Sequence, residues 1–309
     1  MATVFLGDEN QMSNRRKFIS SGLIVAGGTA LLTIPGMGFA NEMFLPATSY
    51  TVQQIIDIII KDVKGAPFPK TVDTIKYGSA DMVVKGIVTT MFPTVDIIEK
   101  TAALGANFII AHEPTYYNGQ DNTNWVADNK IVKKKQDLLE KNKITIWRFH
   151  DYCHSMVPDM VGYGILKKMN WLSYYTSGET TLTIPPVSLQ QLVQQLKSKL
   201  EITHVRVMGN LSASCSLIAM LPGSAGGQRQ VSLIESKNPD VLIVGEQVEW
   251  ETTEYIRDSQ KLGGKTALVI LGHSVSEEPG MVALVDWLQP KIEGIKITHI
   301  ASGDPYTWM

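Results

Sequence analysis

The strongest constraint on the fold is a set of four short apolar runs, each followed at once or after one glycine by a residue that can bind metal. The runs span residues 108–111, 144–149, 241–244 and 267–271, and the residues that follow are His112, His150, Glu246 and His273. Runs of this length are typical of buried strands. In open α/β sheets, functional sites form outside the carboxyl ends of parallel strands. The pattern therefore predicts an α/β fold with one site at which these strand ends meet.

The rest of the chain alternates helical and strand-like segments in the same way. Apolar spacing predicts helices at 51–63, 94–104, 129–142, 160–169, 187–200, 229–237, 249–262 and 279–288, and further strands at 82–91, 203–208, 215–221 and 295–300. Residues 173–185 are expected to form a hairpin or an edge strand. Strand–helix–strand order implies largely parallel sheets with helices on their faces.

The first forty residues have the pattern of an export signal. Two adjacent arginines at 15–16 precede an uncharged run at 22–34, and a small-x-small site follows at 38–40. These features predict a twin-arginine signal peptide at 1–40, cleaved after Ala40, with a general secretory signal as the alternative. The run is shorter than about 20 residues and contains glycines, so we expect no stable membrane anchor. The mature protein is expected to be periplasmic or otherwise exported.

The charge balance argues against a nucleic-acid partner. The chain has 28 Lys and Arg against 30 Asp and Glu, and it has no long basic tract of the kind that binds DNA or RNA. Two cysteines are too few for a disulfide framework. Cys215 opens an apolar run and is expected in the core. Cys153 lies between His150 and His154, where it is either a metal ligand or a bystander.

Six residues form the predicted metal site. They are His112, Glu113, His150, His154, His273 and Glu277. In the pairs His150/His154 and His273/Glu277 the two donors are four residues apart, so both side chains can point at one ion if each pair begins a helix. Imidazole and carboxylate donors without thiolate suit zinc, iron or manganese. Six donors exceed the need of one ion with an open position, and they fit two divalent ions about 3.5–4 Å apart.

Three further features near these strand ends have open roles. Glu246 is expected to serve the reaction as a base, as a partner that orients a ligand, or as a substrate contact. The glycine-rich loop at 223–227 either cradles an anion at the start of the next helix or is a plain turn. It lacks the Lys-Ser/Thr ending of a nucleoside-triphosphate loop. The two remaining histidines, His204 and His299, are expected to be structural.

These motifs carry a family resemblance. They are the segments 86–90 and 111–117, His150 with His154, Gly245-Glu246, and Gly272-His273 with Glu277. In this order they resemble the Nif-three-like dinuclear metal-centre family, whose members are also called type 2 homologues of GTP cyclohydrolase I. The resemblance implies two intertwined three-layer α/β/α lobes, a two-metal site between them and often a ring-shaped homo-oligomer, a hexamer. We place the first lobe at 41–172 plus 265–309 and the second lobe at 173–264.

Two positions depart from the family pattern. Members commonly carry paired histidines where this chain has His112-Glu113, and they commonly have His-x-x-x-Asp where this chain has His150-x-x-x-His154. The number of donors is kept. The two departures leave open which side chain bridges the two ions and which metal the site prefers.

Three functional hypotheses follow. The first is an exported metal-dependent hydrolase, in which a hydroxide that bridges the two ions attacks a phosphoester or amide-like small molecule and Glu246 assists proton transfer. The second is a non-enzymatic oligomeric protein that binds metal or a partner. The third is a purine nucleotide cyclohydrolase, against which export counts because nucleoside triphosphates are scarce outside the cytoplasm. Family membership alone does not fix the substrate.

Overall fold

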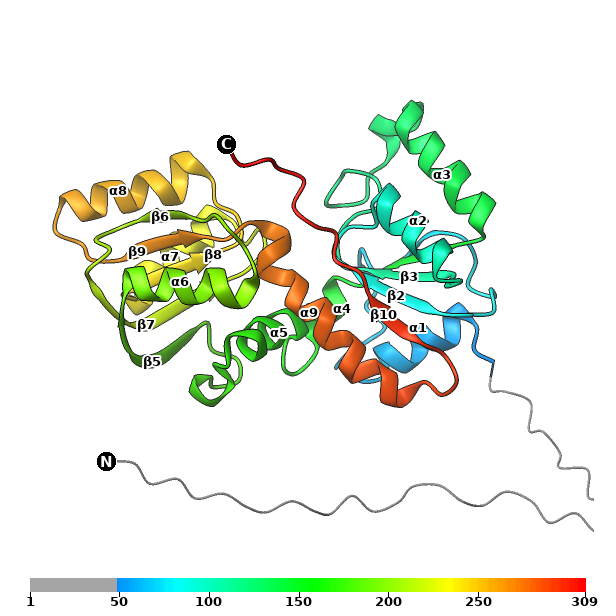
Figure 1. The fold of residues 1–309 in the computed structure, drawn as a ribbon, viewed down its shortest axis with the longest axis horizontal. Helices are drawn as coiled ribbons and strands as arrows, with labels where there is room; N and C mark the ends of the chain where they lie inside the picture. The colour runs from blue at the N-terminus through cyan, green and yellow to red at the C-terminus, as the bar shows by residue number, and fades with distance from the viewer. Residues whose placement is uncertain (1–48) are drawn as a thin grey trace, which may run out of the picture. The chain divides into compact units, whose positions relative to one another are not determined.

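The computed structural model describes residues 49–309, and in this part of the chain the strands form two five-stranded sheets (Figure 1). The predicted α/β class with largely parallel sheets is confirmed. The signal peptide predicted at 1–40 lies outside the described residues. Within 49–309, every helix is too short or too polar to span a bilayer.

The first sheet is mostly parallel, and its central strands are fully buried. Its strand order is β1–β4–β3–β2–β10, with only the edge strand β1 antiparallel to its neighbour. The bounds are β1 Ile75–Tyr77, β2 Ile87–Thr90, β3 Phe108–Ala111, β4 Thr145–Arg148 and β10 Ile297–His299. Every residue of β2, β3 and β4 is buried, as expected for parallel strands covered on both faces.

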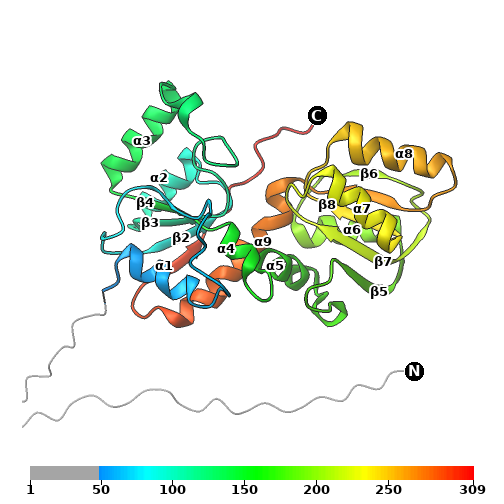
Figure 2. The ribbon, with the colours of Figure 1, turned by 180° about the vertical axis from the view of Figure 1, so that it is seen from behind.

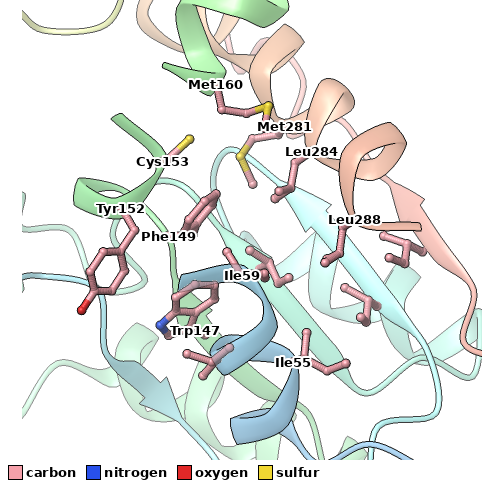
Figure 3. Packing of buried hydrophobic residues seen from close by; sticks show 14 of the residues in the cluster. Ile55, Ile59, Trp147, Phe149, Tyr152, Cys153, Met160, Met281, Leu284 and Leu288 are labelled. Carbon is pink, nitrogen blue, oxygen red and sulfur yellow. The ribbon is translucent and has the colours of Figure 1, made fainter. Parts of the chain in front are cut away.

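Helices cover both faces of the first sheet. One face packs against α1 (Val52–Ile60) and α9 (His273–Leu288), and the other against α2 (Val95–Ala103) and α3 (Lys130–Asn142). Because side chains alternate along a strand, Phe108 and Ile110 join the first core and Ile109 the second. Figure 3 shows the first core, where Leu284 of α9 lies in one cluster with Trp147 of β4. This lobe therefore has three layers.

The second sheet repeats this plan. Its order is β5–β7–β8–β9–β6, with β7, β8 and β9 parallel and both edge strands antiparallel. The bounds are β5 Thr181–Ser188, β6 Arg206–Met208, β7 Ser214–Leu221, β8 Val241–Val244 and β9 Ala267–Ile270. Helices α5 (Met160–Met169) and α6 (Leu189–Leu200) share one core with this sheet, and α7 (Gly227–Lys237) and α8 (Glu254–Lys261) share the other.

Shorter helical segments connect these layers. They are α4 (Asp151–Ser155), a π-helical turn at Glu249–Thr253, and 3-10 turns at Asn124–Val126, Leu172–Tyr174 and Gln289–Lys291.

The long helix α9 links the two sheets. It follows β9 of the second sheet and leads to β10 of the first, as Figures 1 and 2 show. It crosses α5 at two glycines. A Cβ on Gly164 would overlap the backbone of Gly280, and a Cβ on Gly280 would lie 2.7 Å from Val161 Cα. The close contact between α5 and α9 therefore depends on glycine at both positions.

The structure corrects several element predictions. Strand β9 pairs with β8 and β6 of the second sheet, so the lobe boundary predicted at residue 265 does not coincide with the sheets. The helix predicted at 279–288 begins six residues earlier, at His273, and Pro279 lies inside it. Only residues 87–90 of the strand predicted at 82–91 form a strand. Residues 187–188 end β5 and do not start α6. Neither β1 nor α4 was predicted from the sequence.

Candidate metal centre

The parallel register of the first sheet brings its ligands to one level. Ala111 of β3 pairs with Arg148 of β4, so the two strands end side by side. Their next residues deliver His112 and Glu113 from β3 and His150, after Phe149, from β4. The chain then turns at once into α4, which carries His154 one helical turn beyond His150.

The second sheet supplies the other residues from its own strand ends. His273 begins α9 after a two-residue connection from β9, and Glu277 follows one turn later on the same helix face. Glu246 lies two residues after β8. The structure thus brings together all six residues predicted to bind metal, and it places Glu246 against one of them.

His112, His150 and His154 form a cluster of three imidazoles. Their ring centroids are 4.8, 5.1 and 4.9 Å apart, and their potential ligand atoms lie within 4.8 Å of one another. Each Nδ1 lies 3.0 Å from an oxygen, which is the carbonyl of Phe149, a carboxylate oxygen of Asp151 or one of Asp159 respectively. These oxygens accept, so each Nδ1–H donates and Nε2 is the nitrogen that would bind a metal in each ring.

Two buried carboxylates lie beside this cluster. Glu113, Glu277 and His112 form a second group whose potential ligand atoms lie within 4.8 Å of one another. His273 joins them, since its Nε2 lies 3.0 Å from Glu113 Oε1 and 3.1 Å from Glu277 Oε2. Its Nδ1 lies 2.9 Å from Glu246 Oε1. Glu246 therefore holds the outer nitrogen of His273.

Two buried atoms at the middle of the centre have no hydrogen-bond partner. They are His112 Nε2 and Glu277 Oε2, which lie 3.5 Å apart. Glu277 Oε2 also has the ion-pair contact with His273 Nε2 at 3.1 Å, whereas His112 Nε2 has no closer partner. Buried polar atoms in native proteins are nearly always satisfied. An imidazole nitrogen with a free lone pair and a carboxylate oxygen are both metal ligands. The residues present therefore fit a bound metal ion.

The group formed by Glu113, Glu277 and His273 carries charge on its side chains. Burial alone would lower the pKa of His273, but hydrogen bonds from the imidazole to Glu113 and Glu246 and the adjacent Glu277 raise it to about 12. Burial opposes ionisation of Glu277, yet His112 and His273 lower its pKa well below the usual range. Without metal, a protonated His273 thus balances ionised carboxylates. Metal binding there releases this proton.

Arg148 is a site residue that sequence reasoning missed. It is almost fully buried at the end of β4. Its Nη2 lies 3.2 Å from Glu113 Oε2, and its Nη1 donates to Gly119 O and Asp121 Oδ2, each at 2.7 Å. The available signal was an arginine inside an apolar run, because buried arginines are nearly always paired.

Asp73 was also missed. Its buried carboxylate accepts the backbone N–H groups of His150, Asp151 and Tyr152 at 2.8, 3.0 and 2.7 Å. These bonds hold the start of α4, and with it the two histidines of that segment. This contact is hard to predict from the sequence, because Asp73 lies 77 positions before His150.

The glycine-rich loop packs against carboxylates. A Cβ on Gly223 would overlap Glu277 Oε1, and a Cβ on Gly227 would overlap Glu251 Oε2. Gly223 also donates its N–H to Ser276 Oγ at 2.9 Å. The glycines therefore leave room for acidic side chains, and an acidic side chain already lies at the start of α7. Of the two roles predicted for this loop, the plain turn fits this packing better.

The other predicted residues lie outside the centre. Cys153 is fully buried, and burial raises the pKa of its thiol, so it stays protonated and suits the bystander role. His204 stacks on Trp308 with ring centroids 5.0 Å apart. His299 Nδ1 lies 3.2 Å from Thr89 Oγ1. Neither histidine belongs to the two potential metal-binding groups found among residues 49–309.

Comparison with known proteins gives matches along most of the chain. Residues 73–305 match the family model described as Duf34/NIF3 (NGG1p interacting factor 3). The "GTP cyclohydrolase 1 type 2 homolog" of Clostridium acetobutylicum is 22% identical over 228 residues, which are 70% of this chain and 80% of that protein.

Solved structures share the fold at low sequence identity. A Bacillus cereus protein related to NIF3 superposes with a TM-score of 0.66 at 16% identity, over 85% of this chain and 100% of that one. The Staphylococcus aureus protein SA1388 gives a TM-score of 0.65 at 16% identity, over 84% and 99% of the two chains. At this identity the likeness supports the fold alone.

Proposed function

The chain belongs to the Duf34/NIF3 family, and from this premise we propose that it is an exported metal-dependent hydrolase that acts on a phosphoester or amide-like small molecule. One observation carries the proposal most directly. His112 Nε2 is buried without a hydrogen-bond partner, 3.5 Å from the buried Glu277 Oε2, at the point where donors from both sheets meet. A site that bound no metal would be expected to satisfy His112 Nε2 internally.

Six side chains would hold two divalent ions of zinc, iron or manganese. They are His112, Glu113, His150, His154, His273 and Glu277. When bound, two adjacent cations lower the pKa of a shared water and stabilise negative charge on a phosphoryl or acyl oxygen.

The residues around the ligands have separate tasks. Glu246 holds Nδ1 of His273 and is about half exposed, so its carboxylate both orients the ring and accepts a proton from the solvent side. Arg148 forms an ion pair with Glu113 Oε2, while the other oxygen, Oε1, is directed at His273.

The cellular setting belongs to the same proposal. Export rests on the arginine pair, the uncharged run and the small-x-small site in the first forty residues. Assembly as a homo-oligomer, a hexamer, rests on the family resemblance. The printed name of the Clostridium relative points to cyclohydrolase chemistry for that protein. Export disfavours that reaction here, since nucleoside triphosphates are scarce outside the cytoplasm.

Elemental analysis together with a substrate screen tests the proposal. We expect about two transition-metal ions per chain and turnover of at least one member of a panel of phosphoesters and cyclic amides. His273→Ala should lose activity and one of the two bound ions while keeping the fold, as judged by circular dichroism. His204→Ala changes a histidine outside the centre and should retain both. Metal in full occupancy with no turnover across the panel would overturn the hydrolase in favour of a non-enzymatic metal-binding protein.

A further inference from the structure

The two groups of ligands differ in charge. One consists of the imidazoles of His112, His150 and His154, which would bind a metal as neutral ligands. The other contains the carboxylates of Glu113 and Glu277 with His273 between them. We propose that the centre is asymmetric, with a tightly bound zinc ion on the three histidines and a more weakly held, exchangeable ion such as manganese on the carboxylates. This inference rests on the proposal that the centre binds two ions.

Donor chemistry separates the two positions. Three imidazoles with one open position form a donor set that catalytic zinc sites use. Carboxylate-rich sets suit manganese and other hard ions. For a given set of nitrogen and oxygen ligands, zinc also binds more tightly than manganese. The three histidines should therefore take zinc first, and manganese should compete only at the carboxylates.

The three-histidine position is already arranged to bind. Each of the three Nδ1 atoms is fixed at 3.0 Å from an oxygen, so the Nε2 atoms need little rearrangement. Such partners of metal-binding histidines typically strengthen metal affinity by roughly 10–100-fold. Asp159, the partner of His154, is itself fixed, because its other oxygen accepts the N–H groups of Val161 and Gly162 at 2.8 and 3.2 Å.

The carboxylate position is less ready for a second ion. Glu113 Oε1 and Glu277 Oε2 both lie against Nε2 of His273, and these contacts must change before the same atoms can bind metal. The guanidinium of Arg148 also lies 3.2 Å from Glu113 and repels an incoming cation. Both features should weaken the binding of a metal ion at the carboxylates, but they do not prevent it.

His154 is the residue that creates the asymmetry. It completes the three-imidazole group, and without it only His112 and His150 remain at this position. His154→Asp would make both positions mixed imidazole–carboxylate sites and so more alike. This substitution is therefore the sharpest test.

The experiment is a metal titration of the full-length protein after removal of metal with a chelator. Zinc is titrated against a chromophoric competitor, and manganese is followed by electron paramagnetic resonance. We expect a first zinc ion that binds at least about 100-fold more tightly than the second, and one further equivalent of manganese on protein that already holds one zinc. Two zinc ions of equal affinity would overturn the inference.

Three variants locate the positions. His154→Asp should weaken the first zinc site by at least about tenfold and leave the stoichiometry of added manganese unchanged. His273→Ala should abolish manganese binding and keep the tight zinc. His204→Ala should match the wild type. An unchanged first zinc affinity in folded His154→Asp would overturn the assignment.

This titration separates the inference from the proposed function. Equal affinities would remove the asymmetry and leave hydrolysis possible. A protein loaded with one zinc and one manganese that hydrolyses none of the panel would remove the hydrolase and leave the asymmetry standing.

Discussion

Arg148 and Glu113 form a buried ion pair in which the guanidinium Nη2 lies 3.2 Å from Glu113 Oε2. The other oxygen, Oε1, lies 3.0 Å from Nε2 of His273. One oxygen is thus held away from the metal centre and the other is directed into it.

Arg148→Met should destabilise the protein strongly, because it removes the buried cation that Glu113 and Asp121 share. Glu113 then keeps only its contact with His273, and Asp121 keeps only its ion pair with Lys76. Removing one partner of a buried ion pair typically costs roughly 3–5 kcal/mol. Urea denaturation of the metal-free protein measures the change. The matched control is Lys100→Met, which removes an exposed pair with Asp96 and should cost less than about 1 kcal/mol. Similar losses in the two variants would contradict the ion pair's structural role.

Gly223→Ala should expel metal, because its Cβ would overlap the carboxylate of Glu277. Gly223 has a φ of +64°, so part of the cost is backbone strain of roughly 1–2 kcal/mol. Gly105→Ala controls for that strain, since Gly105 has a φ of +70° and a Cβ there meets nothing within 4 Å. We expect both variants to melt at lower temperature and only Gly223→Ala to lose bound metal. Full metal content in Gly223→Ala would contradict the packing argument.

Lys135 should make stability rise with pH. Burial lowers the pKa of its ammonium from 10.5 to about 8, although Nζ donates to Thr115 O at 2.8 Å. Between pH 8 and about 10 the folded state loses this proton before the unfolded state does, so the free energy of unfolding increases with pH. The gain is at most roughly 3 kcal/mol.

Comparison with Lys135→Met isolates this effect. Urea denaturation at pH 7.5, 8.5 and 9.5 should show the rise in the wild type and a flatter profile in the variant. The series stops below pH 10 because burial raises the pKa of the neighbouring Tyr116 to about 12, which adds an opposite trend at higher pH. Parallel profiles in the two proteins would refute the assignment to Lys135.

Glu246→Gln should separate catalysis from metal binding. The carboxamide can still accept a hydrogen bond from Nδ1 of His273, but it cannot take up a proton. Loss of a general base typically lowers kcat by about 10²–10⁴. Metal content should stay at two ions per chain. If kcat is unchanged, Glu246 only orients His273 or has no role in turnover.

The local part of the site could be read from the sequence. His112, His150 and His273 follow strands whose apolar runs are short and buried, and parallel pairing of such strands brings their ends together. The class of fold followed from the same runs. These features depend on residues that are close in the chain or on one rule of sheet geometry.

The non-local part could not be read in this way. Strand β9 belongs to the second sheet because of its pairing with β8 and β6, which no periodicity specifies. Pro279 suggested a helix start, since proline is favoured in the first turn, but α9 continues through it from His273. Arg148 and Asp73 act on the centre through contacts across 35 and 77 positions of sequence.

The origin of β10 has a consequence for the order in which the lobes fold. The first sheet receives this strand, and the apolar residues of α9 beneath it, from the last 37 residues of the chain. During synthesis, every strand of the second sheet leaves the ribosome before β10 does. The lobe whose strands are made first is therefore completed last, and its long-range pairing between β2 and β10 should be a slow step in folding.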